Sequence, residues 1–259
     1  MDFVEIDCRE KTGEWSMSAL QSHDYVEIYF LLEGTRRLFI GDKTFTVNAP
    51  ALCVIPPFRM HKTEGGAYRR INVNVSRTFL TEGECALIDG LAKECVYSLE
   101  NESFKDLLFA LNLAVKCKPT PENPGLYISF MHIILHLLSN APLAPKSVEE
   151  EREKDNSVIR KVVEYVNKNF NNDFSVNDLC RRFYISKNTL TRSFYNLMKC
   201  SVTEYRTFLR ISKAKELLSD GVKNMDEVAE AVGYSSANYF SLIFKRNVGI
   251  APTYYRKSK

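Results

Sequence analysis

Long apolar runs are missing from this chain of 259 residues. The best candidate, residues 126–138, is interrupted by Ser129, His132 and His136, whereas a membrane-spanning helix needs about 18 or more consecutive apolar residues. The first residues also lack the basic segment and the apolar stretch of a signal peptide. These absences argue against a membrane protein and predict a cytoplasmic location.

Paired cysteines are missing as well. The seven cysteines are odd in number, and no two stand in a C-x-x-C arrangement, the spacing typical of zinc sites and of thiol-disulfide motifs. We therefore expect small buried side chains that stay reduced, and neither a disulfide framework nor a zinc site built from cysteines.

The two halves of the chain carry opposite charge. Residues 157–259 contain 18 Lys and Arg against 9 Asp and Glu, a net charge of +9, whereas residues 1–156 contain 17 against 23, a net charge of −6. A basic half beside an acidic one indicates a polyanionic partner for the basic half. The charge alone is explained equally well by a basic surface that only contacts solvent. Other features must therefore decide between that reading and a polyanionic partner.

A linker separates two predicted domains. Residues 141–156 contain two prolines, lack apolar periodicity and include a charged run, as interdomain linkers do. This division predicts one domain at residues 1–140 and another at 157–259, each long enough to bury a core of its own.

Short segments with strand character fill the first 80 residues. They are rich in β-branched and aromatic residues and are bounded by Gly34, Gly41 and Pro56; they cover residues 25–32, 37–40, 43–47, 52–55 and 70–76. Such spacing is typical of β-sandwiches and barrels. Two amphipathic helices follow, at 104–117 with Ser103 as a cap and at 124–139 after an Asn123-Pro124 start. The prediction is a β-barrel with two helices packed outside it.

A pattern near the C-terminus occurs twice. It pairs a Phe with a Tyr eleven residues later, at Phe194 and Tyr205 and again at Phe244 and Tyr255. Upstream of the Phe, Leu190 matches Phe240 at an offset of 50 residues, whereas Ser186 matches Ser235 at an offset of 49. A short helical unit is therefore used twice, with one residue inserted in the second copy.

Each copy has the spacing of a helix-turn-helix unit. In the first copy Ser175 starts a helix, the chain turns near Tyr184, and Ser186 caps a second helix whose Leu190 and Phe194 point inward. A helix over 203–219 joins the copies. Its length of roughly 24 Å, with the width of the flanking helices, places the two second helices near the ~34 Å spacing of successive major-groove faces.

The outward face of each second helix carries side chains suited to DNA. They are Lys187, Asn188, Thr191 and Arg192 in the first copy and Ser236, Asn238, Ser241 and Lys245 in the second. Arginine pairs with guanine, asparagine with adenine, and hydroxyls with bases or phosphates. Any soluble helix exposes polar residues, so one unit would decide nothing. Two matching units in a basic domain favour DNA binding.

These residues belong to a longer pattern. Residues 158–256 resemble the DNA-binding domain of the AraC/XylS family of bacterial transcription regulators. The spaced matches include Leu179, Leu190, Phe194, Tyr205, Arg210, Ala214, Gly233, Phe244, Gly249, Pro252 and Tyr255. Cys180 and Lys199 depart from the family pattern in ways that should alter only local packing. Leu242 stands where family members often have Arg, so we expect the first unit, with Arg192, to carry more of the sequence specificity.

The N-terminal half resembles, more loosely, the cupin-like jelly-roll barrel in which many of these regulators bind an effector. The resemblance rests on His23-x3-Glu27-x6-Gly34 and on Ile55-Pro56-Pro57-x3-His61. It implies a small-molecule site in the barrel. Alternation along one strand would bring several polar side chains to one face. The expected effector-binding residues are His23, Tyr25, Glu27, Tyr29 and His61, and a structural role for them is the alternative.

No metal or cofactor is expected in this half. Metal-dependent cupins have a further histidine where this chain has Gln21, and the sensing domains of the family mostly lack metal. His23, Glu27 and His61 are still a chemically possible three-ligand set.

The sequence therefore predicts a ligand-responsive, sequence-specific DNA-binding regulator and not an enzyme. Expected partners are double-stranded promoter DNA, a small-molecule effector such as a sugar, and a second copy of the chain bound through helices 104–117 and 124–139. RNA polymerase is a further candidate partner, and no membrane partner is expected. Two alternatives stay open: a cupin-type metal enzyme with an accessory nucleic-acid-binding domain, and a constitutive DNA binder whose barrel only dimerises.

Overall fold

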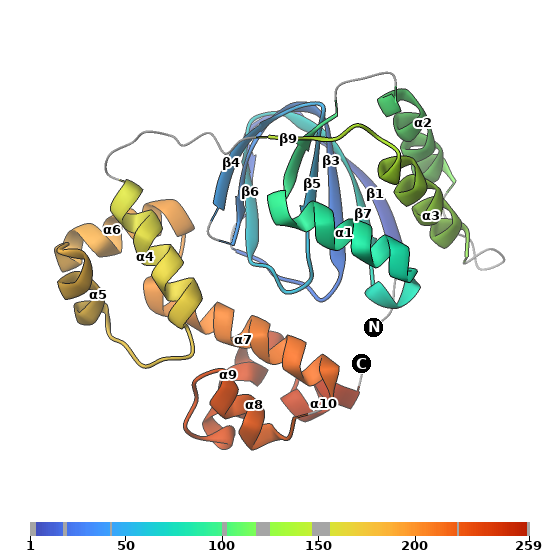
Figure 1. Cartoon of the computed structure of the whole chain (residues 1–259). Helices are drawn as coiled ribbons and strands as arrows, with labels where there is room; N and C mark the ends of the chain where they lie inside the picture. Colours follow the sequence, from blue (N-terminus) through green and yellow to red (C-terminus); the bar gives the residue numbers. More distant parts are fainter. Residues whose placement is uncertain are drawn as a thin grey trace. The chain divides into compact units, whose positions relative to one another are not determined.

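The computed structural model describes residues 4–17, 20–41, 43–99, 103–117, 125–146, 156–221 and 223–257. The chain divides into two compact units, and the main boundary falls between Glu149 and Glu150. We call them the sheet unit and the helical unit; Figure 1 labels their elements. Among the described residues, no helix combines the length and the apolarity needed to cross a membrane.

The sheet unit is built from antiparallel strands. Those described are β1 (Val4–Lys11), β2 (Trp15–Ser16), β3 (Val26–Ile40), β4 (Lys43–Asn48), β5 (Ala51–Ile55), β6 (His61–Gly65), β7 (Tyr68–Val75), β8 (Val96–Ser98) and β9 (Ala144–Pro145). Neighbouring strands follow the order β1-β7-β3-β5-β8-β9, while β4 and β6 pair with β3, and β2 with β6. β9 lies in the segment predicted as a linker and pairs with β8. Residues 147–155 of that segment lie outside the described part.

The strands form an open sheet, so the prediction of a closed barrel is corrected. Within the described residues, β1 pairs with β7 and β9 with β8, and no pairing joins these two ends of the strand order. A barrel needs an unbroken ring of paired strands. Here the long strand β3 instead serves two sets of partners: its first part pairs with β5 and β7, and its last part with β4 and β6.

β3 is one strand where two were predicted. The sequence suggested an end at Gly34, but the strand continues through it with a φ of 90°, a value that glycine adopts without strain. The pairing with β7 shifts register between Leu31 and Glu33, as at a β-bulge, which bends a strand without ending it.

Both faces of the sheet around β3 are buried. Val26, Ile28 and Phe30 contribute to one apolar cluster together with residues of three helices; these are α1 (Glu82–Glu94), α2 (Ser103–Lys116) and α3 (Leu126–Ser139). Tyr29 and Leu31 belong to a second cluster on the opposite face. Because side chains alternate along a strand, Glu27 projects to the face of this second cluster.

The helices of the sheet unit agree with the sequence in two cases of three. α2 and α3 lie close to the predicted 104–117 and 124–139, although the Ser103 side chain and the Asn123-Pro124 start lie outside what is described. α1 was not predicted. Its start is a capping box, in which Thr81 and Glu84 exchange hydrogen bonds.

The helical unit contains two similar helix pairs joined by a long helix. The described helices are α4 (Asn156–Asn169), α5 (Val176–Phe183), α6 (Lys187–Met198), α7 (Val202–Asp220), α8 (Met225–Ala231), α9 (Ala237–Val248) and α10 (Pro252–Lys257). α7 corresponds to the predicted helix 203–219. Tyr205 near its start packs on Phe194 of α6, with ring centroids 5.7 Å apart, whereas Ile211, Ala214 and Leu218 join the core of α8, α9 and α10.

Candidate functional site

The first helix pair, α5 and α6, meets at a tight turn. Ser175 caps α5 in a capping box with Asp178, and its hydrogen bonds lower the pKa of Asp178 to about 2. α5 ends at Phe183 and is followed by Tyr184, whose φ of 52° is left-handed. Ser186 then caps α6 by accepting a hydrogen bond from the backbone of Thr189. The turn therefore spans only two residues between the helix end and the next cap.

The second pair, α8 and α9, repeats this plan with one extra residue. Gly233 has a left-handed φ of 88°, and Tyr234 donates to the carbonyl of Ala229 as Ile185 donates to that of Cys180. The cap of α9 is Ser236. The match of Ser186 to Ser235 was therefore wrong, since Ser236 takes the capping position and Ser235 is the inserted residue.

The exposed face of α6 carries the four side chains predicted for the first copy. Lys187, Asn188, Thr191 and Arg192 are all exposed. Together with Tyr195, Asn196 and Ser201 they line a surface depression of about 540 Å³. Sequence reasoning missed Tyr195 and Asn196, although each lies four residues after a predicted position and so continues the same face.

The face of α9 is less polar. Asn238 and Lys245 are exposed and Ser241 is half-buried, but the Ser236 hydroxyl is engaged as the cap. Leu242 is 64% exposed in the middle of this face. α9 therefore offers fewer polar groups to a nucleic acid than α6 does.

The cations on these two faces are free to meet a polyanion. Within the described part of the chain, Lys187, Arg192 and Lys245 form no ion pair with a carboxylate. By contrast Arg181, on α5, is held 2.5 Å from Asp178. A cation without a carboxylate partner loses no ion pair when it binds phosphate, which favours the α6 and α9 faces as the anion-binding ones.

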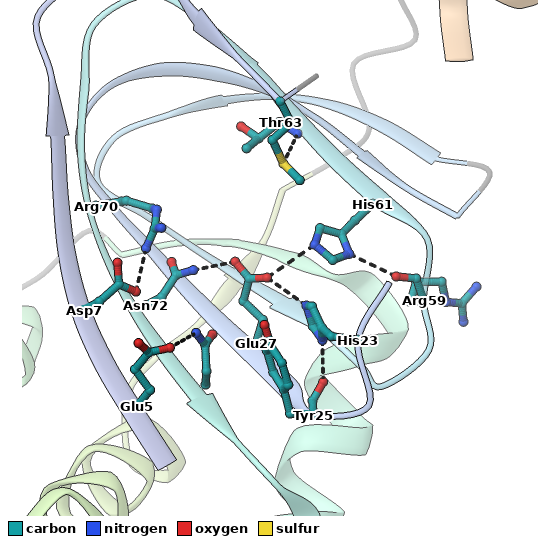
Figure 2. Close-up of polar contacts among 12 residues, drawn as sticks. Glu5, Asp7, His23, Tyr25, Glu27, Arg59, His61, Thr63, Arg70 and Asn72 are labelled. Atoms are coloured by element: carbon teal, nitrogen blue, oxygen red, sulfur yellow. Dashed lines mark hydrogen bonds and ion pairs between the residues drawn. The ribbon is translucent and has the colours of Figure 1, made fainter. Parts of the chain in front are cut away.

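A buried polar cluster lies in the sheet unit, centred on Glu27 (Figure 2). One carboxylate oxygen, Oε2, lies 3.0 Å from His23 Nε2 and 3.4 Å from His61 Nε2. The other, Oε1, accepts a hydrogen bond of 2.5 Å from Asn72. Burial alone would raise the pKa of Glu27, but the hydrogen bonds from the two histidines outweigh it and hold this pKa far below its usual range.

The other predicted effector residues surround this cluster. His23 and Tyr25 precede β3 rather than lying on it, and their rings stack at 3.7 Å. Burial, with Glu27 nearby, raises the pKa of Tyr25 to about 12. Tyr29 is buried on the same face of β3 as Glu27. Four of the five predicted residues therefore lie at or next to the cluster, while Tyr29 lies two positions further along the strand.

Polar side chains continue from the cluster toward β1, and two of their atoms lack partners. Asn74 donates to Glu5, and Arg70 to Asp7. The side-chain oxygens of Asn72 and Asn74 are buried without a hydrogen bond from the described residues. Buried acceptors are nearly always paired in native proteins, with solvent or ligand where protein groups are missing.

Comparisons with known proteins concern mainly the helical unit. A helix-turn-helix domain family matches residues 179–258. The raffinose operon regulatory protein RafR of Pediococcus pentosaceus is 34% identical over 96 residues, which cover 37% of this chain and 35% of RafR. The Msm operon regulatory protein of Streptococcus mutans is 22% identical over 240 residues, covering 90% of this chain and 84% of that protein.

A solved structure gives a similar result. The C-terminal domain of AraT, a response regulator from Geobacillus stearothermophilus, is 30% identical, with a TM-score of 0.39, and covers 40% of this chain and 86% of that one. The alignments span less than half of the first two curated relatives, at 35% and 43% of their lengths. The family match runs from α5 to α10 and so contains both helix pairs. Through this domain, the chain is similar to DNA-binding transcription regulators of the AraC type.

Proposed function

We propose that this protein binds specific promoter sequences through two helix-turn-helix units, α5–α6 and α8–α9, and that a small molecule bound in the sheet unit controls this binding. The observation that carries the proposal is the exposed α6 face, where Lys187 and Arg192 lack carboxylate partners beside Asn188 and Thr191. In this proposal the protein acts in the cytoplasm as a regulator and not as an enzyme, and RNA polymerase is a candidate partner.

The two units are proposed to contribute unequally. α6 presents a guanidinium, an amide and a hydroxyl around one depression, a combination that can read base edges in the major groove. α9 has Leu242 at the centre of its face, which can contact only apolar groups such as the methyl of thymine. In this proposal α6 supplies most base recognition, and α9, with Asn238, Ser241 and Lys245, mainly positions the domain on the backbone.

Arg192→Ala tests the proposed reading helix. Selection of bound sequences from random DNA would first define the site. On that site the variant should lose about 1–3 kcal/mol of binding free energy and relax its preference at one base position, because a bidentate contact to a base is removed. Fluorescence anisotropy on the selected and on a scrambled duplex measures both effects.

Arg181→Ala is the matched control, since it removes the same charge from α5, outside the α6 face. It should weaken binding to both duplexes by a similar, smaller factor. If Arg192→Ala reduced binding to both duplexes equally, or to neither, α6 would not be the helix that reads sequence.

The sheet unit is proposed to hold a polar effector near His23, Tyr25, Glu27, Tyr29 and His61. The two unpaired amide oxygens described above support this, because a ligand with hydroxyl groups would donate hydrogen bonds to them. One relative is named as a regulator of a raffinose operon, and a sugar has the required hydroxyls. We also propose that the sheet unit is cupin-like.

A second copy of the chain is proposed to bind across α2 and α3. Phe109 is 71% exposed on α2, and Leu113 and Ile133 also expose apolar surface on these two helices. Contiguous exposed apolar side chains mark interaction surfaces.

Phe109→Asp should therefore raise the dimer dissociation constant at least about tenfold, because a buried carboxylate would replace an apolar contact. Sedimentation velocity over a concentration series measures it. Leu242→Asp makes a similar change on α9, outside this surface, and should leave the equilibrium unaltered. A protein that stays monomeric at high micromolar concentration before any substitution would refute the proposed contact.

A further inference from the structure

The three side chains around Glu27 Oε2 have the spacing of ligands on one metal ion. His23 Nε2, Glu27 Oε2 and His61 Nε2 all lie within 4.8 Å of one another, and the two histidine–carboxylate distances are 3.0 and 3.4 Å. Bonds of about 2.0–2.2 Å from a metal to nitrogen and oxygen ligands, at angles near 90–110°, place neighbouring ligand atoms about 2.8–3.6 Å apart. Both histidine–carboxylate distances fall in that interval, whereas the two histidine nitrogens, up to 4.8 Å apart, would move closer to share one ion.

The hydrogen bonds of the two rings at Nδ1 leave each Nε2 facing the carboxylate of Glu27. His23 Nδ1 lies 2.9 Å from the carbonyl oxygen of Tyr25, and His61 Nδ1 lies 3.0 Å from that of Arg59. A carbonyl oxygen only accepts, so each Nδ1 carries the proton, and in a neutral ring Nε2 then has a lone pair. Without a metal ion, an Nε2 that carries a proton donates it to Glu27 Oε2, and a bound metal ion would take the place of that proton. A cation at this point of convergence satisfies all three atoms at once.

The surroundings hold these ligands as a metal site requires. Metal-binding histidines commonly donate their second ring nitrogen to a backbone carbonyl, and ligating carboxylates are themselves hydrogen-bonded. Here Tyr25 and Arg59 supply the carbonyls, and Asn72 donates to Glu27 Oε1, which leaves Oε2 for a metal. The stacking of His23 on Tyr25 fixes the plane of one ring. Figure 2 shows the two rings approaching Glu27 from different segments of the chain.

We propose that His23, Glu27 and His61 bind one divalent transition-metal ion through Nε2, Oε2 and Nε2. Two imidazoles favour Zn²⁺, Fe²⁺, Co²⁺ or Ni²⁺ over Mg²⁺ and Ca²⁺, which prefer all-oxygen sites. Three protein ligands leave at least one coordination position open for water or for an oxygen donor of a small molecule. Gln21 is exposed and is not among these ligands. The site replaces the expectation of no metal, and it does not depend on DNA binding.

The direct test uses untagged full-length protein, because a histidine tag would bind metal itself. After removal of metal with a chelator, the protein is titrated with Co²⁺ while its visible d–d absorption is followed, and with Zn²⁺ in a calorimeter. We expect saturation at one ion per chain and a rise in melting temperature with Zn²⁺. Binding of clearly less than one ion per chain, or a Co²⁺ spectrum no different from that of the free ion, would overturn the proposal without any variant.

Variants then assign the ligands. Glu27→Gln keeps the shape of the side chain but removes its charge, and it should weaken Zn²⁺ binding at least about 100-fold; Asn72→Ala, beside the carboxylate, should weaken it about 10-fold. Circular dichroism and the metal-free melting temperature establish first that each variant is folded. If folded Glu27→Gln bound Zn²⁺ as the original protein does, these residues would not be the site.

His132→Ala is the matched control. The chain has four histidines, and His132 also contacts a carboxylate, with its Nδ1 2.7 Å from Glu84 Oε1. This pair gains no third ligand among the described residues. The substitution His132→Ala should therefore leave the Zn²⁺ stoichiometry and affinity unchanged. If His132→Ala removed the bound ion, the metal would lie on α1 and α3 rather than at Glu27.

Discussion

Replacing Phe194 with Ala should lower the free energy of unfolding of the helical unit by about 3–5 kcal/mol, the usual effect of removing a fully buried aromatic ring. Phe194 has no exposed surface, and its ring meets the edge of Tyr205 at 5.7 Å. Tyr205 in turn donates to Asn167. The substitution would open a cavity where α6, α7 and α4 meet.

Urea denaturation of the full chain can measure this change, provided the two units are followed separately. The only tryptophan, Trp15, lies in the sheet unit, so its fluorescence follows that unit. Far-UV circular dichroism reports mainly on α4–α10 of the helical unit, with a smaller contribution from α1, α2 and α3 of the sheet unit. Phe194→Ala should shift the dichroism transition to lower urea and leave the Trp15 transition unchanged. The two signals are needed because a chain of two units can unfold in two transitions, to which a single unfolding free energy does not apply.

Tyr195→Ala is the control for Phe194. It removes the neighbouring aromatic ring, but this ring is 56% exposed, so the change in unfolding free energy should stay within about 0.5 kcal/mol. Phe244→Ala should match Phe194→Ala, since Phe244 is equally buried and meets Tyr255 at 5.6 Å. Equal shifts for Phe194→Ala and Tyr195→Ala would mean that the repeated Phe does not hold the unit together.

The repeat was predictable because its determinants are local. The spacing of Leu190 and Phe194 follows from helix periodicity, and the caps Ser175 and Ser186 are short-range signals. Placing the inserted residue was harder, because Ser235 and Ser236 are the same residue type and either can cap a helix. Only the backbone geometry distinguishes them.

The sheet unit was predicted less well because its strands depend on distant partners. The continuous β3 requires a bulge and a positive φ at Gly34, and neither has a signature that distinguishes it from a turn. α1 was missed although Thr81-x-x-Glu84 is a capping-box sequence.

The two candidate sites also differ in how far the sequence predicts them. The α6 face follows from helical periodicity, and the same periodicity would have added Tyr195 and Asn196. In the sheet unit, the sequence suggested His23, Glu27 and His61 as neighbours only through a family resemblance. Their convergence on one oxygen depends on how β6 pairs with the last part of β3, beginning at His61 and Ile40, and such pairing joins residues far apart in sequence.

Gly233→Ala should also lower the unfolding free energy of the helical unit strongly, by roughly 2–5 kcal/mol. A left-handed backbone costs an alanine about 1–2 kcal/mol, and steric overlap adds about 1–3 kcal/mol. The added Cβ would lie 2.2 Å from the carbonyl oxygen of Asn171. That loop cannot easily yield, because Arg210 donates to the carbonyls on either side of it, those of Phe170 and Asn172.

Gly249→Ala separates the two contributions. Gly249 has the same φ of 88°, but an added Cβ would meet nothing within 4 Å, so only the backbone cost of about 1–2 kcal/mol applies. The difference between the two variants in urea denaturation therefore measures the overlap with Asn171. The same contrast explains Tyr184, which takes the left-handed position of the first turn while 97% exposed: with open solvent around it, that turn tolerates a side chain that the second turn has no room for. If Gly233→Ala cost no more than Gly249→Ala, the contact between the second turn and the α4–α5 loop would be absent in solution.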